Sequence, residues 1–404
     1  MENALDIKSI ELIEQEEAQE IRFPYNLIIH SATKSTLIDE NGKKYIDFSA
    51  NIDNNSFGFN NELVQKVINE NFNAPLYLSK NVEGSHTNSF KQKLKDITGH
   101  SEIYLTESTN DAKDTTLQII TAWAKKNDYK DEVVVINTFG HTQSIDLYKI
   151  LVKENNFNKF VEVDLEFVNK SMANVSALKN FFSRRVAAVI LDTTGILDDS
   201  FVVDHEILES ARMLCDKNHA LLVFNSSKCA PGRMGTLLPA SKVKPDITVL
   251  GTGLAQGIPL GVTSISSKVY DVIKDSYKHL YGSSVLACCL AKYCLETIEK
   301  PDFLDSINNV SEYMLSSLKK LQDKYLNVLD IKAKGLYFVV EMDFNLNEFL
   351  QRCFNDGLVF DVIDSRFIKL TPSFEITNDE IDMLYNVFDK HLLELKPDYR
   401  LDII

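Results

Sequence analysis

Basic charge is scarce in this sequence, and long apolar runs are missing. The 404 residues include 43 lysines and arginines against 58 aspartates and glutamates, so the formal net charge is −15. This balance argues against non-specific binding to nucleic acid or to an anionic membrane. No apolar run approaches the length of a membrane span, and the acidic N-terminal segment (1–20) has no signal-peptide pattern. We therefore expect a cytoplasmic protein with neither a nucleic-acid nor a membrane partner.

Several catalytic and metal-binding patterns are also missing. The six cysteines form no CxxC pair and lie mostly in apolar or helical contexts, which is typical of free, buried thiols in a reducing compartment. The eight histidines include no HExxH and no paired metal spacing. Gly251 and Gly253 lack the third glycine and the strand–turn–helix context of a dinucleotide fingerprint, and no serine-hydrolase elbow is present. These absences exclude the common zinc, nicotinamide and serine-hydrolase motifs.

The central part of the chain alternates between two apolar patterns. A hydrophobic content of 44% over this length supports a large core and more than one domain. Short, continuous, β-branched runs are typical of buried parallel strands, and they occur at 132–137, 186–192, 220–225 and 247–250. Apolar spacing predicts helices over 61–72, 88–98, 109–127 and 142–153. The alternation predicts an α/β fold with a mostly parallel central sheet.

Both ends of the chain are predicted to contribute to a smaller α+β domain. Residues 36–49 alternate around a Glu-Asn-Gly turn and predict a hairpin. A long helix is expected over 283–325, broken near Pro301. The remaining elements are strands at 328–331, 336–342 and 367–370, helices at 346–356 and 377–393, and an amphipathic helix or loose arm at 1–20. We expect an arm and hairpin (1–60), a large α/β domain (61–300) and a C-terminal small domain (301–404).

Two apolar strands frame the most informative segment, residues 219–261. The first strand ends at Asn225 and is followed by a Gly-Arg-x-Gly turn that begins at Gly232. The second strand follows Lys-Pro-Asp and leads into a glycine-rich loop. Together with the Gly-Lys-x-Tyr-x-Asp-Phe of residues 42–48, this order resembles the class III (ornithine/acetylornithine-type) aminotransferases from about residue 25 to 395. The resemblance implies a pyridoxal-phosphate (PLP) transferase of fold type I.

Two chemical positions of that family hold different residues here. In the family, the first strand ends in Asp-Glu, and the loop after the second strand carries the Schiff-base lysine. These positions hold Asn225 and Thr252, and no lysine occurs anywhere in 251–261. PLP chemistry needs an amine to form the imine and a carboxylate to keep the pyridine nitrogen protonated. Threonine has no amine, and asparagine has no charge, so the resemblance implies that this chemistry has been lost.

The positions that bind the cofactor phosphate and ring are altered too. Ser108, Thr109 and Asn110 stand where the family has a Ser-Gly-Ala turn that binds phosphate at a helix start. These residues can equally form a simple helix N-cap, which we favour. Phe139 matches the ring that stacks on PLP, or is a core aromatic at a strand end. Leu280 replaces a threonine that reaches the partner subunit's phosphate.

Three further positions concern the substrate and a substitute amine. Lys369 replaces the family arginine that pairs with the substrate α-carboxylate, keeping its charge but losing its two-pronged geometry. Asp192 stands where the family has a glutamate before proline. Lys228 occupies the position of a glutamine that contacts the PLP ring oxygen. It is either a relocated Schiff-base lysine or a lysine that faces solvent or pairs with a carboxylate.

These replacements, on a retained scaffold, imply a pseudoenzyme, that is, a catalytically inactive aminotransferase-like protein. Family members are dimers with active sites built from both subunits. We therefore expect a homodimer, or a heterodimer in which the chain regulates or stabilises an active paralogue. The emptied cavity could also bind another small molecule, such as an amino acid or a nucleotide. We expect no covalently bound cofactor, and at most weak, non-covalent PLP or another phosphate-bearing ligand.

The alternative is an active class III PLP-dependent aminotransferase with altered chemistry that uses Lys228. If an activity exists, the ornithine/acetylornithine class is the nearest resemblance. The two readings differ in whether an amine of this chain forms an imine with PLP.

Overall fold

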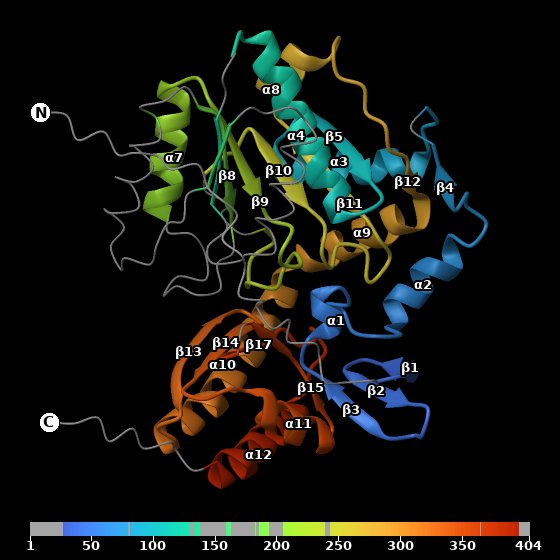
Figure 1. The fold of residues 1–404 in the computed structure, drawn as a ribbon. Coiled ribbons are helices and arrows are strands. Elements are labelled where there is room, and N and C mark those ends of the chain that lie inside the picture. The colour runs from blue at the N-terminus through green and yellow to red at the C-terminus, as the bar shows by residue number, and fades with distance from the viewer. Residues whose placement is uncertain are drawn as a thin grey trace, which may run out of the picture.

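A seven-stranded sheet forms the centre of the molecule in the computed structural model (Figure 1). The described residues are 27–79, 81–129, 133–137, 159–162, 182, 186–193, 205–238, 243–363 and 365–395. The expected N-terminal arm or helix (1–20), the expected helix at 142–153 and Phe139 lie outside them. The strand order is β5-β11-β10-β9-β8-β6-β7. The strands are β5 (Glu102–Thr106), β6 (Val133–Asn137), β7 (Lys159–Glu162), β8 (Val186–Asp192), β9 (Leu221–Asn225), β10 (Ile247–Leu250) and β11 (Gly261–Ile265).

The strands from β10 to β7 pair in parallel, and only β11 runs antiparallel to its neighbours β10 and β5. The predicted α/β fold with a mostly parallel central sheet is therefore confirmed. All residues of β8, β9, β10 and β11 are buried, as expected for a sheet with helices on both faces. The helices near this sheet are α3 (Ser85–Thr98), α4 (Thr109–Lys126), α7 (His205–Lys217), α8 (Ser267–Ile273) and α9 (Val285–Ile298).

Alternate residues of β9 contact opposite layers. Leu221 and Val223 belong to the apolar cluster that contains the buried residues of α4. Leu222 and Phe224 belong to the cluster that contains Leu208 of α7. Because strand side chains alternate between faces, residues 192 and 225, at the ends of β8 and β9, lie on the α4 side of the sheet.

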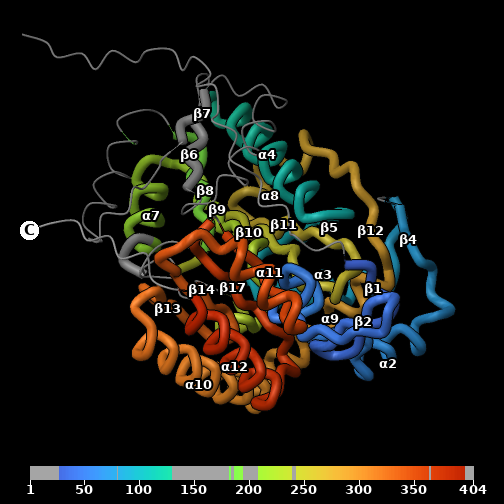
Figure 2. The backbone as a smooth tube through the Cα atoms, turned by 60° about the horizontal axis from the view of Figure 1, so that its bottom comes forward, coloured from blue at the N-terminus to red at the C-terminus, as the bar shows by residue number. Residues whose placement is uncertain are grey.

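The C-terminal part has its own four-stranded sheet, ordered β13-β14-β17-β16. Figures 1 and 2 show its strands between the large sheet and the helices that cover their far side. Pro301 is the first residue of α10, where its fixed φ suits a helix start, so the predicted break in the long helix is confirmed. The elements are α10 (Pro301–Lys324), β13 (Val328–Lys334), β14 (Tyr337–Met342), α11 (Asn347–Asn355), β16 (Asp361–Ile363), β17 (Phe367–Leu370) and α12 (Asn378–Glu394).

The predicted N-terminal hairpin is present and joins the C-terminal part. It turns at Gly42, whose φ of +80° lies in the left-handed region that favours glycine. The short strand β15 pairs in parallel with β3, with Leu358 opposite Ile46. The predicted domain boundaries at residues 60 and 300 stay predictions. The remaining elements are β1 (Ile29–Thr33), β2 (Thr36–Asp39), β3 (Lys44–Asp47), β15 (Leu358–Val359), α1 (Ala50–Asp53), α2 (Glu62–Glu70), β4 (Tyr77–Leu78) and β12 (Ser283–Ser284).

Candidate functional site

The carboxyl ends of β8 and β9 bring three of the predicted positions together. Asp192 is paired with Asn225 in the register of the two strands, and both are fully buried. The Asn225 amide Nδ2 donates to Asp192 Oδ1 at 2.5 Å. Lys228 Nζ lies 2.6 Å from Asp192 Oδ2, and the Lys228 side chain is 14% exposed. A buried carboxylate thus lies on the strand next to β9, while position 225 itself holds an amide.

The amide of Asn225 is held from both sides. Its Oδ1 accepts from the Ser227 hydroxyl at 2.6 Å and from the Ser227 N–H at 3.3 Å. On the neighbouring strand end, the Thr193 hydroxyl donates to Ser226 Oγ at 2.9 Å. Because these contacts fix the amide, they also fix the orientation of Asp192, which in turn anchors the Lys228 ammonium. Lys228 is thus paired with a carboxylate, and the pairing places its amine at the carboxyl edge of the sheet.

Lys113 is a buried amine that the sequence reasoning missed. It lies on α4, is 7% exposed, and belongs to the buried face of that helix. Burial lowers the pKa of Lys113, the nearby Lys228 lowers it further, and Asp192 acts in the opposite direction. A lysine inside the apolar stripe of an amphipathic helix was the available signal, because lysine is almost never buried without a partner.

A pocket of about 380 Å³ lies beside the start of α4. It contains four predicted positions, Ser108, Thr109, Asn110 and Thr252. The remaining lining comes from residues 251–260 and from Asn51 and Asn54. The structure therefore brings the position that lacks lysine together with the expected phosphate cradle.

The start of α4 is a capped helix terminus. Ser108 is the N-cap: its Oγ accepts from the Asp111 N–H at 3.1 Å and donates to Asp111 Oδ2 at 2.7 Å. The favoured N-cap interpretation of this segment is thus what the structure shows. A Cβ at Gly251 would lie 2.1 Å from Thr109 Oγ1, so the loop can approach the helix this closely only with glycine.

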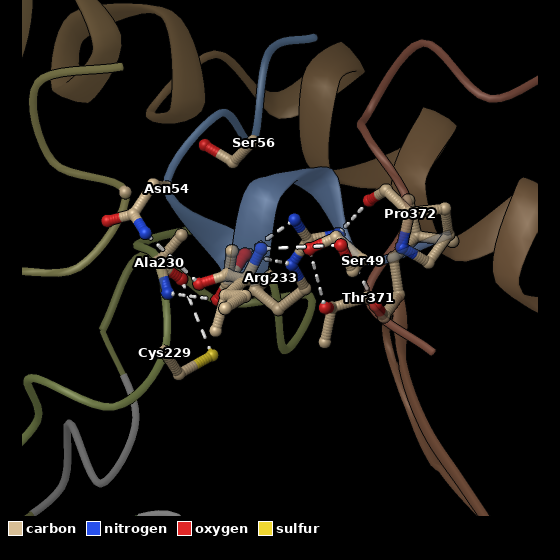
Figure 3. A network of polar contacts seen from close by, with 12 residues as sticks. Ser49, Asn54, Ser56, Cys229, Ala230, Arg233, Thr371 and Pro372 are labelled. Carbon is tan, nitrogen blue, oxygen red and sulfur yellow. Dashed lines mark hydrogen bonds and ion pairs between the residues drawn. The ribbon is translucent and has the colours of Figure 1, made fainter. Parts of the chain in front are cut away.

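A strained turn supplies the other wall of the pocket. Ala50, Asn51, Ile52 and Asp53 of α1 have φ values between 46° and 63°. Each such residue costs roughly 1–2 kcal/mol relative to a right-handed conformation. The turn is fixed by Arg233, a fully buried residue of the Gly-Arg-x-Gly motif (Figure 3).

Arg233 joins three segments of the chain. Its Nε and Nη2 donate to Asp53 Oδ1 at 2.8 and 2.6 Å, and the Ala230 N–H donates to Asp53 Oδ2 at 2.7 Å. The Arg233 guanidinium also donates to the carbonyls of Leu336 and Pro372. This network explains why the motif contains arginine. A single guanidinium group donates hydrogen bonds to a buried carboxylate and to two carbonyls at once.

Lys369 is held by a carboxylate of the C-terminal sheet. Its Nζ lies 3.4 Å from Asp361 Oδ2 on the paired strand β16, and both residues are largely buried. Lys369 is not among the residues that line the pocket. Its assignment to a substrate carboxylate stays a prediction. Leu280 is exposed.

The described part of the chain shows neither a membrane span nor a metal centre. No helix there is long and apolar enough to cross a membrane. In the same residues, no group of three or more His, Cys, Asp and Glu side chains could hold a metal ion. All six cysteines are free and buried, as expected from their contexts.

A mostly parallel sheet, polar groups at its carboxyl edge and a second sheet shared by both ends of the chain give the chain the fold known as fold type I. The family model of the class III aminotransferases matches residues 18–392, and the chain belongs to this family.

Known relatives and solved structures agree with this assignment. Acetylornithine aminotransferase of Clostridium acetobutylicum is 23% identical over 91% of this chain and 97% of its own length. The probable mitochondrial acetylornithine aminotransferase of Dictyostelium discoideum is 26% identical over 92% of this chain and 84% of its own. The ornithine aminotransferase of Toxoplasma gondii has a similar fold, with a TM-score of 0.78 at 21% identity, covering 93% of this chain and 92% of that structure.

The expectation that the chain holds no covalent cofactor is wrong. The chain belongs to a family of PLP-dependent aminotransferases, and one solved neighbour, a Toxoplasma gondii ornithine aminotransferase, has PLP at its active site. The error came from giving the loss of lysine at position 252 and of aspartate at position 225 more weight than the alternative amine of Lys228. The structure offers Lys113 and Lys228 as amines near Asp192. Lys228 and Asp192 lie outside the residues that line the pocket at the start of α4.

The expectation of a pseudoenzyme finds no support in these comparisons. They establish an aminotransferase family with acetylornithine and ornithine aminotransferases among the relatives, and none of them shows inactivity.

Proposed function

We propose that this chain is a PLP-dependent aminotransferase of the acetylornithine/ornithine class, with Lys228 in place of a lysine at position 252. The observation that carries the proposal is the contact of 2.6 Å between Lys228 Nζ and the buried Asp192 carboxylate at the carboxyl edge of the sheet. In open α/β sheets, ligands bind at this edge. Family membership supports the reaction class, and the names of the relatives support the substrate class.

Each polar group of the site has a task in this proposal. Lys228 would hold PLP through its amine, and PLP would supply an electron sink for the bonds of the substrate carbon. Asp192 holds the ammonium form of Lys228 in place and accepts its proton when the amine reacts. Asn225 orients Asp192 through the bond of 2.5 Å. The N-terminal turn of α4 and the Thr252 hydroxyl are donors for a phosphate group.

Trapping with borohydride tests the proposal. The purified protein is incubated with PLP, reduced, digested and mapped by mass spectrometry. We expect a pyridoxyl adduct on Lys228 and its loss in Lys228→Gln, and we expect amino transfer from acetylornithine or ornithine to a 2-oxo acid in the wild type but not in Lys228→Gln.

Lys268→Gln is the matched control. Lys268 is also paired with an aspartate, since its Nζ lies 3.1 Å from Asp246 Oδ1, but Asp246 precedes the start of β10 and the Lys268 side chain is 45% exposed. It should keep both the adduct and the activity. If the wild type gives no adduct on any lysine and transfers no amino group, the proposal is wrong and the pseudoenzyme interpretation replaces it.

Assembly is part of the same proposal. We infer a homodimer from the dimeric active sites that the resemblance implies; a heterodimer with an active paralogue is the second form. The cytoplasmic location stays a prediction.

A further inference from the structure

The pocket beside α4 has a wall of amide groups whose orientation the backbone fixes. Asn55 Nδ2 donates to the Gln256 carbonyl at 3.2 Å, so Asn55 Oδ1 is left to accept from Asn51 Nδ2, at 2.9 Å. Asn54 Nδ2 donates to the Asn51 carbonyl at 2.9 Å. A carbonyl oxygen can only accept, so none of these amides can be turned round without losing a hydrogen bond. The amide nitrogens of Asn51 and Asn54 are therefore committed to the turn itself.

Two amide oxygens of this wall remain for a ligand. Within the described part of the chain, no hydrogen bond reaches Asn51 Oδ1 or Asn54 Oδ1, and both residues line the pocket. Figure 3 shows the amide oxygen of Asn54 pointing away from the Arg233 network. Each asparagine oxygen can accept two hydrogen bonds. This wall can therefore accept from the N–H groups of a bound molecule.

The loop that forms another wall is tied to the same turn and adds apolar surface. Gln256 Nε2 donates to the Gly253 carbonyl at 2.8 Å and to Ser56 Oγ at 3.0 Å, and its Oε1 accepts from the Phe57 N–H at 2.9 Å. In the same loop, Ile258 is half-buried and lines the pocket. The pocket thus combines hydrogen-bond acceptors on the turn with an aliphatic side chain on the loop.

Charged groups are missing from this lining. None of the described residues that line the pocket carries a charge. Two carboxylates close to it in sequence have other partners, since Asp53 accepts from Arg233 and Asp111 accepts from the Ser108 hydroxyl. An ammonium group placed in the pocket would lose water without gaining a carboxylate, which is unfavourable. A neutral N–H group with an apolar end fits the same lining without that cost.

We propose that this pocket selects an N-acylated side chain over a free side-chain amine, with Asn51 and Asn54 as specificity-determining residues. The inference rests on the proposed function, whose substrate class includes both acetylornithine and ornithine. The acetamide N–H of acetylornithine donates to the free asparagine oxygens, and its methyl group packs against Ile258. The side-chain ammonium of ornithine meets no counter-charge among the described lining residues. No bond changes at this end of the substrate, so the preference acts through binding.

Kinetics with the two substrates test the preference. We expect the kcat/KM of the wild type for N-acetylornithine to exceed that for ornithine by about 10-fold or more, because a site with unmatched polar groups discriminates strongly. Asn51→Asp turns one neutral acceptor into a carboxylate, at a left-handed position (φ +56°) that aspartate tolerates. It should move the ratio of the two kcat/KM values toward ornithine by about 10-fold or more.

Asn60→Asp is the matched control. Asn60 is also an asparagine with a left-handed φ, of +51°, but it is not among the residues that line the pocket. This variant should keep the wild-type ratio. Urea denaturation of both variants shows whether each is folded, and the binding measurement on the wild type decides the question if Asn51→Asp is not.

Calorimetry measures the same preference without turnover. 5-Acetamidopentanoate carries the acetamide end but no amino group to transfer. Its ester analogue, 5-acetoxypentanoate, has nearly the same shape and an oxygen in place of the N–H. We expect the PLP-loaded wild type to bind the amide about 10-fold more tightly than the ester, as for loss of a hydrogen bond that leaves its partner unsatisfied.

The outcomes separate the two proposals. A wild type that forms an adduct on Lys228 and uses ornithine as well as N-acetylornithine refutes the selectivity and leaves the proposed function standing. Equal binding of the amide and the ester, or no binding of either, refutes the roles of Asn51 and Asn54 whatever the activity. A protein that forms no adduct and transfers no amino group refutes the proposed function, whereas tighter binding of the amide by that protein would still support the preference of the pocket.

Discussion

At the end of β8, the Asp192 carboxylate has two neighbours of different kinds. One oxygen receives the Asn225 amide and the other lies against the Lys228 ammonium. A buried ion pair of this kind is weak support for stability as a whole, but removing one partner leaves a charge buried without compensation. In the proposed function, the pair fixes the position of a reactive amine and adds little to the stability of the fold.

Asp192→Asn should destabilise the protein by about 3–5 kcal/mol, because Lys228 then keeps its charge without a partner. Urea denaturation measures the loss. Asp216→Asn is the control: Asp216 pairs with Arg212 at the surface, and such pairs contribute only about 0–1 kcal/mol. Equal losses in the two variants would show that Lys228 is well solvated.

Lys113 makes stability depend on pH in a definite direction. Its folded-state pKa is lowered from 10.5, so between the folded and unfolded pKa values the unfolded chain binds more protons. Stability from this group therefore rises with pH in the window below about 10.5 and is least at lower pH. The free energy of unfolding of Lys113→Met, measured in urea, should lack this rise. The difference in stability between the wild type and the variant should therefore grow with pH. A difference that does not change with pH would mean that Lys113 titrates normally.

The sequence analysis singled out Asn225, Lys228 and Thr252, but it did not predict the contact between Asn225 and Asp192. The contact between Asn225 and Asp192 depends on the register of two strands that lie far apart in sequence. Lys113 was missed because helical periodicity alone does not say which polar member of a buried stripe lies next to a site.

At the scale of elements, the left-handed turn α1 depends on its partner motif. Its conformation is unfavourable for non-glycine residues, and Asp53 holds it through Arg233 and Ala230. Asn51 and Asn54, in and just after this turn, line the pocket. The Gly-Arg-x-Gly motif therefore fixes the turn that lines the pocket, although Arg233 itself does not line it.

Arg233→Lys should cost about 3 kcal/mol or more, because lysine cannot bridge Asp53 and two carbonyls together. The variant should also retain PLP less well on gel filtration, since Asn51 and Asn54 lose their fixed positions. Arg366→Lys is the control, because Arg366 forms an exposed pair at 4.0 Å from Glu341. A stable Arg233→Lys protein with full PLP retention would contradict this account.

Elements with strong local signals were predicted well. Helices α3, α4, α9 and α10 and strands β8 and β10 lie where periodicity and Pro301 placed them. The short strands β5 and β11 were missed: β5 alternates with half-buried residues, and both are stabilised by antiparallel pairing to each other. Such pairing is tertiary information that a single short run does not carry.

At the scale of the whole molecule, apolar side chains are exposed around the β4–β12 pair. Phe72, Leu76, Tyr77 and Leu280 are all exposed, and Tyr77 lies directly on β4. Contiguous exposed apolar side chains mark interaction sites. We expect this surface to be the interface of the inferred homodimer.

Leu76→Asp should convert the dimer to a monomer in analytical ultracentrifugation, because it would bury a charge in the interface. Leu326→Asp is the control: Leu326 is also exposed but lies in the C-terminal part. A wild-type monomer, or a Leu76→Asp dimer, would refute this assignment.

The central claim is that an amine other than residue 252 holds PLP. Peptide mapping after borohydride reduction of the PLP-loaded protein tests it most directly. The account predicts one pyridoxyl adduct, on Lys228, which is lost in Lys228→Gln and kept in Lys268→Gln. A reduced protein without an adduct on any lysine would contradict it.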